Sequence, residues 1–330
     1  MGRESNEGNS EADEGTLPPD EAFAAIGHDI RIRILEALAT TDRADRPLSF
    51  SDLREQVGTV DSAQFNYHLD KLVGHFVERS EEGYDLYRAG GRIAEAVLSG
   101  AVTEDPRVAP TEIDRRCHYC GATVEVAYRQ ERLEVYCTEC AGTYGKSNTQ
   151  EDTGEVPYQY GFLGNLNLPP VGLGDRTLTD AYDAATAWSL SERQVAAGGM
   201  CPRCSATLEE DTKICEDHDS DGGCDNCNSR YAILHEATCP NCVFGQRVAF
   251  GLFLFDNIDL QAFLTGHGID LVSPDQYRYA SVVMDYEEEL LEADPFEARF
   301  TFTADGDAIT LTVDDDFEVV EAETHDADGS

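Results

Sequence analysis

The chain has 330 residues, with 24 Lys and Arg against 65 Asp and Glu, and a formal net charge of −41. This length allows two or three domains with at least one substantial core. The charge excludes a protein that binds nucleic acid in dilute buffer through a basic surface. Lysine occurs only three times. Such an acidic, lysine-poor surface suits molar salt, where the Debye length falls to about 3 Å, and predicts a protein of a halophilic archaeon.

Cysteine usage and hydropathy narrow the class further. No run approaches the length of apolar sequence that a membrane span needs, so we expect no membrane partner. Residues 1–19 are polar and acidic, unlike a signal peptide, and are expected to form a disordered tail. Eleven cysteines without an export signal favour reduced thiolates that hold metal in the cytoplasm over a disulfide framework.

Residues 20–98 predict a small helical domain. A first helix is expected over 20–40, with His28 as a partly exposed or capping residue and not a ligand. Residues 49–58 carry a capping pair at their start and a glycine at their end, and residues 61–75 begin with Asp61 as a cap, so two short helices joined near Gly58 indicate a helix-turn-helix. Residues 76–87 alternate around Glu82-Gly83 as a hairpin, and 91–98 closes the domain as a helix.

The second of these short helices presents a polar face. Phe65, Leu69 and Leu72 form its apolar stripe. The remaining faces carry amide and hydroxyl groups that match the edges of base pairs. Taken alone, the pattern is more often that of an ordinary amphipathic surface helix, and the neighbouring segments change this balance.

Helix, helix and hairpin in this order are typical of a winged helix-turn-helix. The segments Ile30–Leu35, Phe65–Leu72 and Gly83–Leu86 resemble ArsR-type (arsenical-repressor-like) regulators over roughly residues 20 to 98. This resemblance implies a transcription regulator that binds double-stranded DNA, and a homodimer formed through the closing helix. Metal-sensing members carry cysteines on the helix that here reads Phe50–Arg54, and this chain has none.

The resemblance implies that the base-reading residues lie on the helix expected at 61–75 and that residues beside them contact phosphates. Base edges would be contacted by Ser62, Gln64, Asn66 and Tyr67, and phosphates by Lys71 and Arg79. Residues 20–100 hold nine basic and fifteen acidic residues, a net charge of −6. In molar salt counterion release adds little to DNA affinity, so base-edge contacts and shape must carry more of the binding.

After a linker at 99–114, residues 115–145 predict a zinc ribbon. Cys117 and Cys120 are separated by sixteen residues from Cys137 and Cys140, and the segment between them reads as two strands and a turn. Four thiolates leave no open coordination position, so the site is expected to be structural. His118, inside the first knuckle, is expected to face solvent. Residues 146–199 contain a Gly- and Pro-containing stretch and a helix at 177–196 whose Trp188 is expected in the core.

Residues 200–245 carry a double zinc-knuckle region. Its ligands are Cys201, Cys204, Cys215, His218, Cys224, Cys227, Cys239 and Cys242. With the first ribbon they make twelve ligands, enough for three Zn²⁺ ions. Sequential pairing puts 201, 204, 215 and 218 around one ion and 224, 227, 239 and 242 around the other; it closes the shortest loops and is the first expectation. The alternative puts 201, 204, 224 and 227 around one ion and 215, 218, 239 and 242 around the other.

Residues 246–322 predict a C-terminal α+β unit, followed by a tail at 323–330. Helices are expected at 256–266 and 274–293, and strands at 296–302 and 309–313 flank an Asp305-Gly306 turn. The whole chain is therefore expected to be an α+β multidomain protein with an N-terminal winged helix-turn-helix, zinc-ribbon hairpins, and C-terminal helices plus a hairpin.

Three functions are compatible with these features. The first is a DNA-binding transcription regulator. The second is an adaptor that binds a protein of the transcription machinery, because a winged helix followed by a zinc ribbon also resembles the alpha subunit of archaeal transcription factor E. The third is a zinc enzyme such as a nucleobase deaminase, but the required motif is only half present at Cys137-Thr-Glu139 and full cysteine coordination leaves no reactive water. We therefore expect no enzyme.

Overall fold

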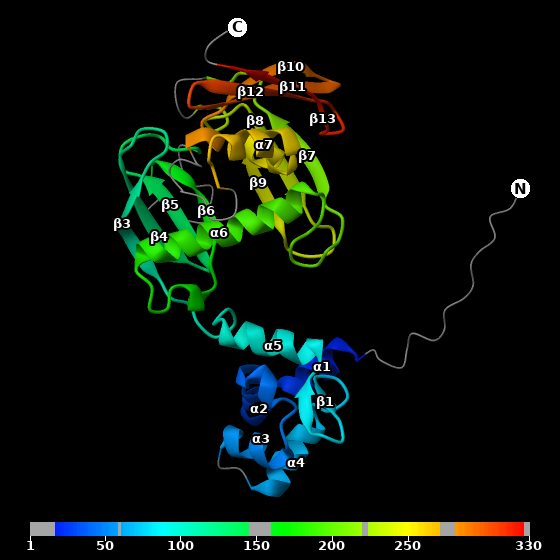
Figure 1. Ribbon diagram of the computed structural model, residues 1–330. Helices are drawn as coiled ribbons and strands as arrows, with labels where there is room; N and C mark the ends of the chain where they lie inside the picture. The colour runs from blue at the N-terminus through cyan, green and yellow to red at the C-terminus, as the bar shows by residue number, and fades with distance from the viewer. Residues whose placement is uncertain (1–16, 59–60, 145–159, 220–223, 271–280, 327–330) are drawn as a thin grey trace, which may run out of the picture. The chain divides into compact units, whose positions relative to one another are not determined.

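The computed structural model describes residues 17–58, 61–144, 160–219, 224–270 and 281–326 (Figure 1). The chain divides into an N-terminal unit, residues 1–104, and a C-terminal unit, residues 105–330. Both helices and antiparallel sheets are present, so the α+β class is confirmed. Most of the tail expected at 1–19 lies outside the described residues.

The N-terminal unit consists of helices and one two-stranded hairpin. In chain order these are α1 (Pro19–Ile26), α2 (Asp29–Thr40), the 3₁₀ turn η1 (Arg43–Asp45), α3 (Phe50–Val57), α4 (Ser62–Asp70), β1 (Val77–Arg79), β2 (Tyr84–Leu86) and α5 (Arg88–Leu98). Strands β1 and β2 pair antiparallel, as the alternating pattern predicts. One buried cluster of aliphatic and aromatic side chains joins α2, α3, α4 and the hairpin.

Local capping explains where these helices begin. Asp61 accepts hydrogen bonds from the backbone N–H groups of Ala63 and Gln64, at 2.8 and 3.1 Å, so it caps α4 as predicted. The predicted helix over 20–40 is wrong as a single element. It breaks at Gly27, and His28 caps α2 by accepting a hydrogen bond from the Ile30 N–H at 3.2 Å.

The predicted helix over 61–75 is also too long, because α4 ends at Asp70. The N–H of Gly74 donates to the carbonyl of Val77 at 2.9 Å, and Gly74 has a φ of +92°, so the chain turns here into β1.

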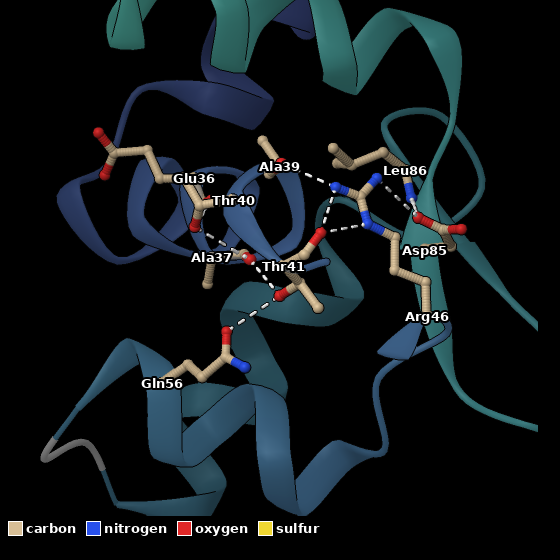
Figure 2. A network of polar contacts seen from close by, with 9 residues as sticks. All are labelled: Glu36, Ala37, Ala39, Thr40, Thr41, Arg46, Gln56, Asp85 and Leu86. Atoms are coloured by element: carbon tan, nitrogen blue, oxygen red, sulfur yellow. Dashed lines mark hydrogen bonds and ion pairs between the residues drawn. The ribbon is translucent and has the colours of Figure 1, made fainter. Parts of the chain in front are cut away.

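A partly buried arginine, Arg46, holds the segment between α2 and α3 in place (Figure 2). The Arg46 guanidinium donates to the carbonyl oxygens of Ala39 and Thr41, each at 2.7 Å, and lies 3.8 Å from the Asp85 carboxylate on β2. The Thr41 hydroxyl in turn donates to Gln56 on α3 at 3.2 Å. These contacts fix the hairpin and α3 against the end of α2.

The described residues of the C-terminal unit form three sheets. Its elements are β3 (Val108–Arg116), β4 (Thr123–Arg129), β5 (Arg132–Cys137), β6 (Phe162–Asn167), η2 (Pro170–Gly172), α6 (Leu178–Ala197), β7 (Glu209–Ile214), β8 (Ile233–Thr238), β9 (Gly245–Ala249), η3 (Phe250–Asp256), α7 (Ile258–Gly266), β10 (Glu287–Ala293), β11 (Phe296–Ala304), β12 (Asp307–Val313) and β13 (Val319–His325). The sheet orders are β3-β4-β5-β6, β7-β8-β9 and β10-β11-β12-β13.

Helix α6 joins two cores of this unit (Figure 1). Ala181 and Ala185 pack on the β3–β6 sheet, whereas Leu190 and Ala197 pack against η3 and the sheets that follow. The helix matches its predicted range, but Trp188 is 50% exposed, so its predicted core position is wrong. Small side chains at four-residue spacing face the sheet, and Trp188 falls beside that stripe.

Several strands replace predicted irregular or helical segments. Strand β3 occupies residues 108–116, so most of the second half of the expected linker is a sheet edge. Residues 287–293, predicted as the end of a helix, form β10 and pair with β11; residues 271–280 lie outside the described ranges. Strand β13 includes residues 323–325, which were expected in the tail.

The predicted β-hairpin at 296–313 is confirmed. Asp305 and Gly306 have φ values of +54° and +97°, as a tight two-residue turn between β11 and β12 requires.

Candidate metal centres

The twelve predicted ligands form three groups of four. These are Cys117, Cys120, Cys137 and Cys140; Cys201, Cys204, Cys239 and Cys242; and Cys215, His218, Cys224 and Cys227. Within each group the ligand atoms all lie within 4.8 Å of one another. A tetrahedral zinc site with Zn–S bonds of about 2.3 Å has ligand-to-ligand distances of about 3.8 Å. Each group therefore has the size of a tetrahedral metal site.

The first tetrad lies at the end of the β4–β5 hairpin. Cys137 is the last residue of β5 and pairs with Val124. The Sγ atoms of Cys117 and Cys140 are 3.7 Å apart, and those of Cys120 and Cys137 are 3.4 Å apart. Burial opposes ionisation of Cys137, but N–H groups of Glu139 and Cys140 donate to its Sγ and lower its pKa below the usual thiol value. This is how a knuckle prepares a thiolate for a cation.

The outer tetrad of residues 201–242 is held by the β7–β8 hairpin. Glu209 at the start of β7 pairs with Thr238 at the end of β8, which brings the knuckle before β7 beside the knuckle after β8. The Sγ distances are 3.6 Å between Cys201 and Cys242 and 3.5 Å between Cys204 and Cys239. A hydrogen bond from the Asn241 side chain lowers the pKa of Cys204 to about 6.

The inner tetrad lies in the connection between the same two strands, at the opposite end of the hairpin. Ile214 and Ile233 pair there, and the described part of the loop carries all four ligands. The N–H of Asp219 donates to the Cys224 sulfur at 3.4 Å and is the largest cause that lowers the pKa of Cys224, to about 7.

His218 completes this tetrad through a defined ring nitrogen. Its Nε2 lies 3.1 Å from the carbonyl oxygen of Arg230. A carbonyl can only accept a hydrogen bond, so Nε2 carries the proton and Nδ1 is left with its lone pair. That Nδ1 lies 3.5 Å from the Cys227 Sγ. A ligand histidine held by its second nitrogen in this way is typical of zinc sites.

Both predicted pairings of the knuckles at 201–242 are wrong. The first pair joins the last, and the two middle pairs join each other. The pairing of β7 with β8 is the cause. The first and last cysteine pairs lie side by side where β7 begins and β8 ends, and the two middle pairs lie in the connection between the strands. Strands β7 and β8 were not predicted. The sequence of β7 is strongly polar, and its residues alternate between exposed and partly buried, so it lacks the apolar pattern of a strand.

The first tetrad and the inner tetrad are joined by Arg230. Its N–H donates to the Thr143 carbonyl at 2.7 Å, and its guanidinium carbon lies 3.8 Å from the centre of the Tyr119 ring. His118 does not face solvent as predicted. It is half-buried, and its Nε2 is buried without a hydrogen-bond partner among the described residues.

The predicted base-reading residues are all exposed on α4. Ser62, Gln64, Asn66 and Tyr67 are exposed, Tyr67 by 60%, while Phe65 and Leu69 are fully buried. Lys71 and Arg79 are exposed too. The ammonium of Lys71 lies 5.7 Å from the Tyr67 ring centre, so a cation extends this polar surface.

The fold and the three tetrads define an α+β chain with an N-terminal helical unit and a C-terminal unit rich in candidate metal sites. Residues 114–319 match a family described as Domain of unknown function (DUF7351), and the chain belongs to that family. Residues 19–97 match a second description, Domain of unknown function (DUF7347). No curated protein and no solved structure matches the chain. None of the helices in the described ranges has the length and apolar character of a membrane span.

Proposed function

We propose that this protein is a sequence-specific, DNA-binding transcription regulator whose N-terminal unit is a winged helix-turn-helix. The observation that carries the proposal is that Ser62, Gln64, Asn66 and Tyr67 are all exposed on α4, while its apolar stripe is buried. Amide and hydroxyl groups at the start of a helix can read the donor and acceptor pattern of the major groove. The β1–β2 hairpin, with Arg79, would lie along the neighbouring backbone.

In the proposed regulator the three tetrads bind Zn²⁺ and support the C-terminal unit. Thiolates with one histidine are ligands that zinc favours, and each tetrad supplies a full tetrahedral set. No position is left for a reactive water, so the proposed role of the metal is structural and the proposed protein is not an enzyme. This unit would serve dimerisation or binding of an effector or partner.

The test is selection of bound fragments from a random duplex library by the full chain in multimolar KCl. Enrichment of a defined sequence is expected. Gln64→Ala should then weaken binding to that sequence by about 1 to 3 kcal/mol while binding to unrelated duplex stays the same. Gln56→Ala is the matched control, because Gln56 lies on α3 and its side chain accepts a hydrogen bond from the Thr41 hydroxyl at the end of α2 (Figure 2). A loss that is equal for all sequences would contradict base reading.

A second candidate, an adaptor of the transcription machinery, is favoured by the charge of the hairpin. Glu78, Glu81 and Glu82 are exposed there beside Arg79, and such a tip is repelled by phosphate. An acidic hairpin would fit a basic surface of a polymerase or an initiation factor. Co-purification with the polymerase in native salt, together with no enriched DNA sequence, would favour the adaptor over the regulator.

A further inference from the structure

The C-terminal unit contains a cavity of about 410 Å³ between β6, helix α6 and strand β9. This volume lies in the range of sites for small organic molecules. Its walls are partly apolar, with Leu163, Tyr182 and Leu252 among the lining residues. All of these residues fall within the family region 114–319.

The charge of the lining is opposite to that of the chain. Arg116, Arg132, Arg193 and Arg247 line the cavity, whereas Glu192 is the one carboxylate among the lining residues. In the whole chain acidic residues outnumber basic ones by 65 to 24. A concentration of arginines in so acidic a protein indicates a local preference for an anion.

The carboxylate inside the cavity is already neutralised. Glu192 lies 3.1 Å from the guanidinium of Arg203, which does not line the cavity, and it accepts a hydrogen bond from Asn167 at 2.7 Å. Arg247 forms an ion pair with Glu236, which also lies outside the lining. Because Glu192 pairs with Arg203, no ion pair in the described ranges joins it to Arg116, Arg132 or Arg193.

Arg193 is the strongest candidate for an anion contact. It is half-buried on α6, and no hydrogen bond or ion pair joins its side chain to any described residue. Holding a guanidinium partly out of water without a partner is unfavourable, and a bound oxyanion would reverse that cost. Arg132 is exposed and likewise has no ion pair in the described ranges.

Two orphaned polar atoms also line the cavity. The Oδ1 atom of Asn165 and the Nε2 atom of His118 are buried without a hydrogen-bond partner among the described residues. Buried polar atoms are seldom left unpaired. A protonated His118 Nε2 can donate to an oxyanion, whereas the Asn165 Oδ1 can only accept and would need a donor group elsewhere on the ligand. The neutral walls between these groups suit an apolar body.

We propose that this cavity binds a small organic oxyanion with an apolar body, with Arg193 as the main contact for the anionic group. Two parallel N–H groups of a guanidinium match the two oxygens of such a group. That fork also discriminates against chloride, a spherical anion that would otherwise compete in molar salt. The proposal goes beyond the proposed function, because ligand binding here does not require DNA binding.

The test uses two fluorescent probes that differ by one anionic group. These are 8-anilinonaphthalene-1-sulfonate and its uncharged counterpart N-phenyl-1-naphthylamine, titrated against the full, metal-loaded chain in multimolar KCl. Saturable binding of one sulfonate probe per chain is expected, with an affinity at least about 10-fold above that of the uncharged probe, since a hydrogen bond to a charged group contributes on the order of that factor. Equal affinities would overturn the proposal.

Substitutions then locate the anion contact. Arg193→Gln should weaken binding of the sulfonate probe about 10-fold or more and leave the uncharged probe unaffected. Arg193→Lys, which keeps the charge but loses the fork, should give an intermediate loss. Arg299→Gln is the control, because Arg299 is an exposed arginine on β11 that pairs with Glu289 at 3.4 Å and does not line the cavity. If Arg193→Gln and Arg299→Gln bind the sulfonate probe equally well, the assignment is wrong.

Discussion

The N-terminal unit and the knuckle region around β7 and β8 are stabilised in different ways. The N-terminal unit buries a continuous set of apolar side chains, with Ile34, Leu35 and Leu38 of α2 fully buried, and residues 1–104 contain no cysteine. Around the outer tetrad the buried cluster is small, and Cys201 and Cys239 are among its members. The outer knuckles bury few apolar side chains and cannot offset their chain entropy by burial alone, whereas Ile233 and Leu234 at the other end of β8 belong to the larger core of the C-terminal unit. The outer tetrad could hold a metal ion at this place, and in the proposed protein that ion supplies the stability that the small cluster does not.

The largest expected effect is that of metal removal. A structural zinc ion contributes about 10–16 kcal/mol in small zinc domains at neutral pH, as much as or more than the whole stability of a typical domain. Chelation should therefore unfold the segments around the three tetrads and leave α2 to α4 folded. Metal analysis should give three zinc ions per chain before chelation, and hydrogen exchange should show lost protection in 117–140 and 201–242 but not in the N-terminal unit. Equal loss of protection in both units would contradict the idea that the N-terminal unit is stable without metal.

The next effect concerns the apolar core of the N-terminal unit. Leu35 is fully buried, so Leu35→Ala should destabilise this unit by about 2–5 kcal/mol through lost burial and a cavity. Leu98→Ala, at a leucine that is 43% exposed at the end of α5, is the matched control and should cost much less. Hydrogen exchange of both units in high KCl measures the change. A response of the metal-binding region to Leu35→Ala would show that the units do not fold independently.

Sequence predicted best the features that depend on local chemistry. The caps Asp61 and Ser49, the Asp305-Gly306 turn and the cysteine pairs are each set by residues a few positions apart, and all appear in the structure. The winged-helix interpretation and the DNA contacts stay predictions, although the exposure of α4 is compatible with them.

Features that depend on distant segments were missed or misassigned. The knuckle pairing follows from the β7–β8 register, and strand β10 exists because β11 pairs with it over the acidic segment Glu287–Ala293. The cavity was not predicted at all. Arg132, Arg193 and Arg247 come from three separate elements, and no local pattern marks any of them.

A smaller, pH-dependent effect is expected at Glu288 on β10. Its carboxylate accepts hydrogen bonds from the N–H groups of Ala232 and Ile233 at the start of β8, yet burial dominates and raises its pKa from 4.5 to about 7. The folded chain thus holds this proton more tightly than the unfolded chain does. The resulting stabilisation is fully present below about pH 4.5 and is lost as the pH rises through about 7.

Glu288→Gln should remove this pH dependence, which after allowance for solvent screening we expect to be about 1–2 kcal/mol. Denaturant unfolding of the C-terminal unit between pH 5 and 8 measures it. Glu287→Gln, at an exposed position of the same strand, is the control. A stability curve that is unchanged in Glu288→Gln would show that Glu288 does not titrate with folding.

The smallest expected effect is that of a substitution at Trp188. It compares an exposed with a buried side chain on the same helix, α6. Trp188 is 50% exposed on α6, so Trp188→Gln should change stability by no more than about 0.5 kcal/mol, whereas a buried tryptophan would cost several times more. Leu190→Ala, two residues along and only 7% exposed, should cost about 2–4 kcal/mol and is the reference. Thermal unfolding of the metal-loaded chain, followed by circular dichroism, compares them. Helix α6 packs on both the β3–β6 sheet and the core that follows. A large effect of Trp188→Gln would therefore mean that its indole is covered by a surface outside the described residues. The comparison between the two kinds of stabilisation would then have to include that surface.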